Sequence, residues 1–464
     1  MSTDKSKPPH QHRTLLKSSG IVACGVLASR MLGFVRDVLL ARFLGTGFLA
    51  EAFFVAQRIP NLLRDMVGEG AANAAIVPVL SGYAHQKSKE EWQECINVVL
   101  AWGVIILGSI TFLGIFAAPW IVRLIAPGFA GEPGELQLTV DLTRIMFPYL
   151  VLIALTAFQA GILYSLNAFF APSWGPCLLN LAMILSVWVA CLFSWPLAYM
   201  LSVGVLIGGV WQFWAQWLAL RRRGVYWKMP VSLNHEGARQ IGRLLLPRLW
   251  GSTVYQINIF VDTFCASLAV IVGTGGIAAI YYANRMIQFP LGVFGYALSS
   301  VALPSLSKLA QEGDMARFRS TLFFALRNLM LILIPAALGM VIFSKWIIHL
   351  VFQRGAFDAY STSVTSQVMF YAALGLPFVG ASRILVSAFY ALQDTKTPVK
   401  AATVCLVVNA VLNGCLMFPL KIGGIALASS IAGAVNCLLL WHGLNKKLKA
   451  HQNSQRDKFF PPKC

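Results

Sequence analysis

The sequence predicts an all-α polytopic membrane protein built from two similar halves. Of its 464 residues, 57% are hydrophobic and only 12% are charged, and the mean hydropathy is +0.68. These values lie far outside the range of soluble globular domains. Apolar stretches of about 20 residues, the length that crosses a bilayer, recur along the whole chain. Short sequence patterns of the first half also return in the second half.

The apolar stretches predict about twelve transmembrane helices, since each is near the length that a bilayer requires. They are residues 20–45, 50–83, 97–125, 142–167, 174–195, 198–220, 242–272, 277–307, 321–344, 363–391, 400–419 and 423–444.

The internal repeat predicts the domain organisation. Residues 52–58 (AFFVAQR) match residues 279–285 (AIYYANR), and Tyr164–Asn167 matches Tyr390–Gln393, both at an offset of about 226. Six helices in each half is an even number, so both halves enter the membrane in the same sense. We therefore expect two six-helix lobes related by a pseudo-two-fold axis along the membrane normal, with a substrate site between them near the midplane.

The predicted parts are a cytoplasmic segment at 1–19, an N-lobe at 20–222, a cytoplasmic linker at 223–240, a C-lobe at 241–444 and a cytoplasmic tail at 445–464.

Basic residues set the predicted orientation. The formal net charge is +19, and Lys and Arg concentrate in alternate connections between the apolar stretches. The positive-inside rule then places both termini in the cytoplasm. Such basic loops reflect topology and anionic lipid headgroups, so we expect no nucleic-acid partner. The nine cysteines show no spacing typical of a disulfide framework or a zinc site.

Charged residues interrupt the first two apolar stretches. A charged side chain at bilayer depth is costly, so such residues face the interior of a helix bundle or a water-filled cavity. Residues seven or eleven apart share a helix face, which groups Arg30 with Asp37 and Arg58 with Glu69. Arg36 and Arg64 do not lie on these two helix faces. Ion pairs that hold helices together are the alternative interpretation for any single pair of these charges.

A second polar group lies in the other half. Asp262 is an isolated acid, Asn409 and Asn413 are one turn apart, and Ser429 follows in the last apolar stretch. Carboxylate, amide and hydroxyl oxygens suit a hard cation such as sodium. The alternative interpretation is a cluster of hydrogen-bonded polar side chains that packs three helices together.

Several motifs carry a family resemblance. They are Ser29–Asp37 (SRMLGFVRD), Ala52–Ala56 (AFFVA), Pro60–Arg64 (PNLLR), Gly68–Ala71 (GEGA) and Asp394–Pro398 (DTKTP). They resemble the MurJ (MviN) lipid II flippases of bacteria, which belong to the multidrug, oligosaccharidyl-lipid and polysaccharide exporter superfamily. The resemblance extends over almost the whole chain.

The resemblance implies that lipid II, the undecaprenyl-diphosphate-linked disaccharide pentapeptide, is moved from the cytoplasmic to the periplasmic leaflet of the inner membrane by alternating access. It implies that Arg30, Arg36, Arg64 and Arg285 are cavity arginines that bind the diphosphate, that Glu69 is the matching acid, and that the backbone carbonyl of Ile425 completes the possible sodium site. Arg58 is the repeat mate of Arg285 and is added without support from the family; Asp37, the last residue of the first motif, is a further candidate. Guanidinium groups suit a diphosphate because they are permanently charged and fork-shaped.

Two features depart from the family pattern. Asn284 stands where members often have an acid. Many members also have two further C-terminal helices for the lipid tail, whereas here a polar tail follows the twelfth predicted helix.

We expect no cofactor, with a sodium ion or the membrane potential as candidates for coupling. The lipid bilayer and the cell-wall synthesis machinery are the other expected partners.

Other classes of membrane protein fit less well. A glycosyltransferase or acyltransferase needs acids or a histidine near one membrane face, and the sequence shows no such constellation, so we expect no enzyme. A channel would not need two tandem halves. Within transporters, the alternative is an exporter of another lipid-linked oligosaccharide or of an amphipathic drug.

Overall fold

The computed structural model describes residues 9–68, 71–230 and 232–459, with side chains described for 20–62, 75–84, 86–132, 134–230, 232–245, 256–295 and 298–449. In these ranges the chain is helical and contains no β-strand, which confirms the predicted all-α class.

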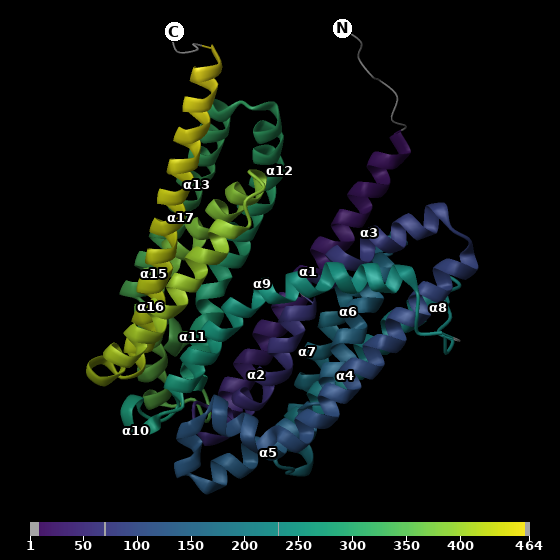
Figure 1. Ribbon diagram of the computed structural model, residues 1–464. Coiled ribbons are helices and arrows are strands. Elements are labelled where there is room, and N and C mark those ends of the chain that lie inside the picture. The colour runs from purple at the N-terminus through teal and green to yellow at the C-terminus, as the bar shows by residue number, and fades with distance from the viewer. Residues whose placement is uncertain (1–8, 69–70, 231, 460–464) are drawn as a thin grey trace. The chain divides into compact units, whose positions relative to one another are not determined.

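The helices follow one another closely along the chain (Figure 1). Their bounds in the first half are α1 Pro9–Leu44, α2 Phe48–Gly68, α3 Ala71–Gln86, α4 Lys89–Ile125, α5 Pro133–Met146, α6 Tyr149–Ser165, α7 Phe170–Phe193 and α8 Leu197–Arg221. Those in the second half are α9 Glu236–Ala266, α10 Ala269–Val272, α11 Gly276–Pro290, α12 Tyr296–Glu312, α13 Met315–Ile342, α14 Ser344–Phe352, α15 Ala359–Ala391, α16 Lys396–Leu420 and α17 Ile422–Phe459.

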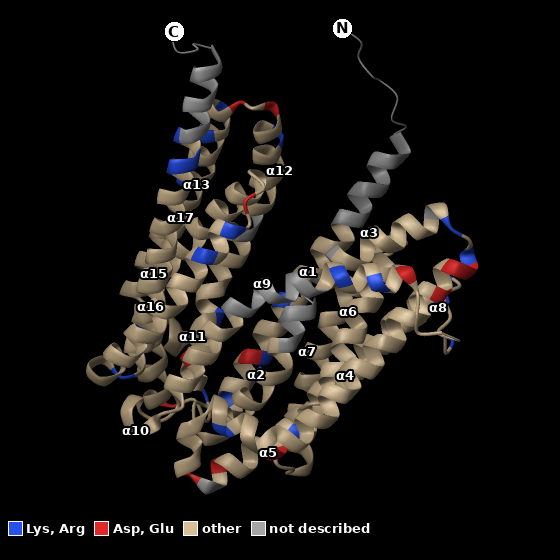
Figure 2. Cartoon of the chain, viewed as in Figure 1, with Lys and Arg blue, Asp and Glu red and all other residues tan. Residues whose placement is uncertain are grey.

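Nine helical stretches within the described ranges are long and apolar enough to cross a membrane. Figure 2 shows one of them, α17, with a long stretch free of charged residues and basic residues toward its C-terminal end. The predicted stretches at 20–45, 50–83 and 242–272 are also helical, as α1, α2 with α3, and α9. None of them is among the nine, and within α3 the stretch Ala75–Ala84 counts only as a shorter apolar helix. The count of twelve therefore stays a prediction.

The chain forms two compact units. Unit 1 contains residues 1–40, 52–124 and 132–253, and unit 2 contains residues 41–51, 125–131 and 254–464. Helix α9 thus belongs to unit 1 up to Thr253 and to unit 2 from Val254. The predicted lobe and linker bounds, and the pseudo-two-fold axis, stay predictions.

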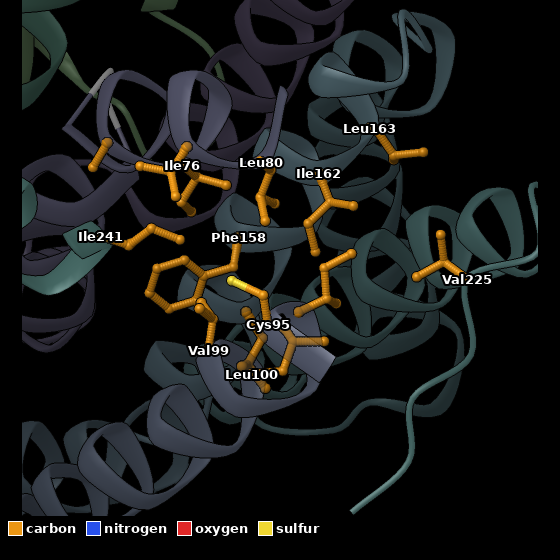
Figure 3. Close-up of a cluster of buried hydrophobic side chains, with 14 of the residues drawn as sticks. Ile76, Leu80, Cys95, Val99, Leu100, Phe158, Ile162, Leu163, Val225 and Ile241 are labelled. Atoms are coloured by element: carbon orange, nitrogen blue, oxygen red, sulfur yellow. The ribbon is translucent and has the colours of Figure 1, made fainter. Parts of the chain in front are cut away.

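The core of unit 1 is a cluster of apolar side chains from α3, α4, α6 and α9 (Figure 3). Ile76, Ile96 and Leu163 are almost completely buried in it. Helix α8 packs against α7 and α6. The α7–α8 contact is close because Gly208 has no side chain: a Cβ there would lie 2.8 Å from the Cα of Leu179. Small residues at such contacts are typical of membrane helix packing.

Helix α15 is central to unit 2, where it packs against α11, α12, α13 and α17. Beside it, three fully buried rings form an aromatic cluster: the centroids of Tyr282 and Phe352 lie 5.3 Å apart, and those of Tyr282 and Phe357 lie 5.4 Å apart. Edge-to-face and tilted contacts at these distances add to the stabilisation from burial.

The turns that end α6 and α15 have the same backbone geometry. Asn167 and Gln393 both have φ of 55°, in the left-handed region that non-glycine residues rarely adopt. The N–H of Asn167 donates to the carbonyl of Tyr164, and that of Gln393 donates to Tyr390, both at 3.0 Å. The repeated sequence patterns thus form the same turn in both halves.

Candidate functional site

A buried ion pair lies on α1 within unit 1. Arg36 Nε and Nη2 donate to Asp37 Oδ1 at 3.0 and 2.7 Å, and Arg36 Nη1 donates to Asn180 Oδ1 at 2.9 Å. The exposed fraction is 7% for Arg36, 1% for Asp37 and 6% for Asn180. The sequence grouped Asp37 with Arg30 rather than with Arg36, and it missed the amide of Asn180 on α7, which joins the pair. The signal that could have found it is a lone asparagine inside an apolar span.

Close approach of α1 to α7 produces this arrangement. A Cβ on Gly25 would lie 2.9 Å from the carbonyl oxygen of Ser173, so only glycine allows this helix spacing. One turn further along α1, the backbone carbonyl of Ser29 accepts a hydrogen bond from Asn180 Nδ2 at 3.0 Å. Asn180 thus bonds both the backbone of α1 and the side chain of Arg36, which fixes the orientation of the guanidinium.

The other predicted residues of the first two helices lie in different surroundings. Arg30 on α1 is exposed, and Arg58 on α2 is half-buried among buried neighbours. The side chain of Arg64 and the whole of Glu69 lie outside the described residues. The structure therefore does not bring Arg30 into the Arg36–Asp37 pair, and the substrate-binding roles of all these residues stay predictions.

Arg285 is half-buried on α11 in unit 2. Its Nη2 donates to Tyr281 Oη at 2.9 Å, and its Cζ lies 4.8 Å from the centroid of the Tyr281 ring. A cation–π contact of this kind positions a guanidinium while leaving its charge intact. The neighbouring Asn284 is exposed.

The second predicted group forms one hydrogen-bond network in unit 2. Asp262 Oδ1 accepts from Asn413 Nδ2 at 2.8 Å, and Asp262 Oδ2 accepts from Ser429 Oγ at 3.0 Å. Asn409 Nδ2 donates to Ser429 Oγ and Asn409 Oδ1 accepts from Asn413 Nδ2, both at 3.0 Å. Helices α9, α16 and α17 meet at this network. The structure thus brings together the residues that the sequence grouped.

The donor set of this network suits a hard cation. Asn413 Oδ1 is buried and accepts no hydrogen bond from the described side chains, and Ile425 is buried one turn before Ser429 on α17. The network offers oxygen atoms alone, and the described part of the chain contains no cluster of His, Cys, Asp and Glu for a transition metal. Oxygen-only sites select cations such as sodium over zinc.

One further buried carboxylate was not predicted. Glu51, at the start of α2, accepts a hydrogen bond from the backbone N–H of Ile277 at 2.9 Å through its Oε1 atom. Ile277 lies in the first turn of α11, where the N–H groups have no helical partner and the helix dipole favours a negative charge. Both residues belong to unit 2, and the contact joins segments 226 residues apart.

The many helical stretches long and apolar enough to cross a membrane define a multi-pass membrane protein. A solved structure described as an inward-facing multidrug resistance MATE family transporter of the MOP superfamily matches with a TM-score of 0.75 over 92% of this chain and 96% of that chain. At 13% identity, this match shows the fold alone.

The family model "Lipid II flippase MurJ" matches residues 40–460, and the chain belongs to this family. It is 34% identical over 443 residues to the "Lipid II flippase MurJ" of Burkholderia cenocepacia, covering 94% of this chain and 84% of that protein. It is also 34% identical over 443 residues to the "Probable lipid II flippase MurJ" of Buchnera aphidicola, covering 95% and 86%. The structure titled "Lipid II flippase MurJ, inward closed conformation" matches with a TM-score of 0.79 and 29% identity, covering 91% and 87%.

Proposed function

We propose that this protein flips lipid II from the cytoplasmic to the periplasmic leaflet of a bacterial inner membrane. The observation that carries the proposal is the match to the MurJ family over residues 40–460. The protein then acts as a transporter rather than as an enzyme. Its product feeds peptidoglycan polymerisation, so we expect it to work beside the cell-wall synthesis machinery.

Arginines of the membrane helices supply the chemistry that a diphosphate requires. Arg30 is exposed, and Arg58 and Arg285 are half-buried. A guanidinium at membrane depth is costly unless water or an anion faces it, and charge-assisted hydrogen bonds to a diphosphate offset that cost by about 1.5–3 kcal/mol each. Arg64 joins this set by its family motif.

Arg36 has a more specific role in the proposal. Three of its N–H groups donate to Asp37 and Asn180. A diphosphate therefore competes with Asp37 for the guanidinium and binds it only by exchanging these bonds. Arrival of the substrate would then alter the contact between α1 and α7, which links binding to a change in helix packing.

Transport proceeds by alternating access. A substrate shifts the equilibrium between two states only through a difference in affinity, so the contacts of the arginines with the diphosphate must differ between inward-open and outward-open states. The basic connections of the chain support a topology with both termini in the cytoplasm.

Coupling through the Asp262 network is the second part of the proposal. Sodium bound by Asp262, Asn413 Oδ1, Ser429 and the carbonyl of Ile425 would replace hydrogen bonds that the carboxylate now accepts from Asn413 and Ser429. Asp262→Asn removes the charge at nearly constant volume. We expect it to abolish sodium-dependent thermal stabilisation of the purified protein. If the thermal stability of the parent protein does not change with sodium concentration, the network has a structural role only.

The proposed function is tested by complementation of a flippase-depleted strain together with lipid II binding to the purified protein. We expect Arg30→Ala and Arg285→Ala to abolish complementation and weaken binding at unchanged expression. Arg285→Lys should also fail, because lysine lacks the planar fork. The exposed Arg222 at the end of α8 is the matched control, and Arg222→Ala should complement. Normal lipid II binding by both alanine variants would refute the assignment of the arginines.

A leaflet-accessibility assay tests the flipping itself. In cells depleted of this protein and lacking another flippase, lipid II should disappear from the outer leaflet. An unchanged outer-leaflet signal would refute the proposed function.

A further inference from the structure

Unit 1 contains an apolar groove that the proposed transport does not use. It has a cavity volume of about 770 Å³ and lies between α4, α6, the segment Ser232–His235 and the start of α9. We call it the α4/α9 groove. This volume lies in the range of sites that hold small molecules, roughly 300–1,000 Å³.

The floor of the groove is well packed. Val99, Phe158 and Ile241 are buried and come from α4, α6 and α9. Figure 3 shows Val99 and Ile241 beside the ring of Phe158. The floor is therefore a permanent part of the unit 1 core.

The wall of the groove is apolar and accessible. Trp102, Ile106 and Ile110 line it at successive turns of α4 and are all exposed. Helix α4 is one of the helices long and apolar enough to cross a membrane. The wall is thus an exposed apolar surface on a helix that can cross the membrane, which is the kind of surface that an acyl chain contacts.

One end of the groove is polar. Among the described residues that line the groove, Arg239 is the permanent cation and none is acidic. The Arg239 guanidinium donates to Asn234 Oδ1, which holds it at this end. Trp102 Nε1 donates to the carbonyl of Leu233 at 3.0 Å and ties the wall to the polar segment. An apolar groove with a fixed cation at one end complements an amphipathic anion.

We propose that the α4/α9 groove binds an anionic phospholipid of the phosphatidylglycerol class. An acyl chain lies along Trp102, Ile106 and Ile110 over the Phe158 floor, and the phosphate contacts Arg239. Basic pockets between membrane helices bind anionic headgroups in this manner, and each buried methylene of the chain adds to the affinity. This site is independent of lipid II flipping.

Quenching of tryptophan fluorescence tests the site in the full-length protein. The protein is reconstituted with acyl-brominated phosphatidylglycerol or phosphatidylcholine, and the contribution of Trp102 is the difference from Trp102→Phe. We expect that contribution to reach half-quenching at an about fivefold lower fraction of phosphatidylglycerol than of phosphatidylcholine, the effect of one basic residue near the headgroups. Arg239→Gln should remove this preference, whereas the control Arg222→Gln, outside the groove, should retain it.

A second pair of variants tests occupancy by the acyl chain. Gly242 lines the groove, and a Cβ there would meet no atom within 4 Å, so a side chain can begin there and Gly242→Phe should occupy part of the groove. It should reduce Trp102 quenching by both lipids. Gly108 on α4 has equally open surroundings but does not line the groove, so Gly108→Phe should leave quenching unchanged.

Three results would overturn the proposal. They are equal quenching of Trp102 by the two lipids in the parent protein, equal effects of the two arginine variants, and equal effects of the two glycine variants. Displacement of phosphatidylglycerol by an equimolar amount of undecaprenyl diphosphate would also overturn it, because the groove would then hold an isoprenoid tail.

Discussion

The Asp394 carboxylate joins the turn before α16 to the end of α17, and its removal gives the sharpest prediction about stability. Asp394 Oδ1 accepts from the backbone N–H groups of Lys396 and Thr397 at 3.0 Å, and Oδ2 accepts from Thr397 Oγ1 at 2.5 Å. Lys447 Nζ lies 2.5 Å from Oδ2. The side chain of Asp394 is only 9% exposed, whereas that of Lys447 is 40% exposed.

These contacts allow the effect of each substitution to be estimated. Breaking a fully buried ion pair costs about 3–5 kcal/mol, and an exposed pair contributes about 0–1 kcal/mol. Because Lys447 can be hydrated again, we expect Asp394→Asn to cost about 1–2 kcal/mol. Asparagine still caps the helix; Asp394→Ala also loses the cap and costs about 1 kcal/mol more. For a unit of about 200 residues, Asp394→Asn should lower Tm by about 2–8 °C.

The pH dependence follows from the same contacts. Burial acts to raise the pKa of the Asp394 carboxyl, but hydrogen bonds from Lys447 and Thr397 outweigh it and lower the pKa. A carboxyl with a lowered folded-state pKa stabilises the protein above its unfolded pKa of about 3.9, and that stability is lost as the pH falls below this value. The Tm of the parent should therefore fall more steeply than that of Asp394→Asn below about pH 4.

Thermal unfolding of the detergent-purified protein across pH measures both effects. Lys447→Met should reproduce the loss at neutral pH, and the double variant should show coupling between the two sites. Lys446→Met, at the adjacent exposed lysine, is the control and should have no effect. An unchanged Tm in Asp394→Asn, with a pH profile parallel to the parent, would refute the reasoning.

Three further predictions concern other sites. Arg36→Ala should destabilise the protein by about 1–3 kcal/mol, because the buried Asp37 loses two charge-assisted hydrogen bonds, and the double variant with Asp37→Asn should recover part of this loss in thermal unfolding. Glu51→Ala should lower stability by about 1–3 kcal/mol, because the Ile277 N–H loses its acceptor, whereas Glu51→Gln should retain most of it; equal losses would contradict this. In cysteine labelling of intact cells, Gly131→Cys should react from outside and Lys87→Cys should not; the reverse pattern would contradict the topology.

Much of the fold follows from the sequence because a bilayer imposes simple rules. Apolar length predicts the helices, and the tandem repeat predicts two similar halves. The residues Asp262, Asn409, Asn413 and Ser429 could be grouped in advance since polar side chains are scarce in apolar helices and must bond one another.

The specific partners of the charged residues could not be predicted. Arg36 bonds an amide 144 residues away, and Glu51 bonds a backbone N–H that has no signature in the sequence. Helical periodicity places a residue on a face of its own helix, but the neighbour at that face depends on how the helices pack. The sequence therefore shows that a buried charge needs a partner without showing which residue supplies it.

The matching turns at Asn167 and Gln393 bear on how the two halves diverged. Both residues keep the left-handed backbone, yet the next residue is Ala168 in the first half and Asp394 in the second. A shared, energetically unfavourable backbone conformation is consistent with inheritance of both turns from one ancestral unit before duplication. Ala168 has no carboxylate, so the first turn has no counterpart of the Asp394–Lys447 ion pair. The two turns thus share a backbone conformation although the residues beside them differ. We therefore expect each turn to tolerate substitution of its flanking residues by those of the other turn.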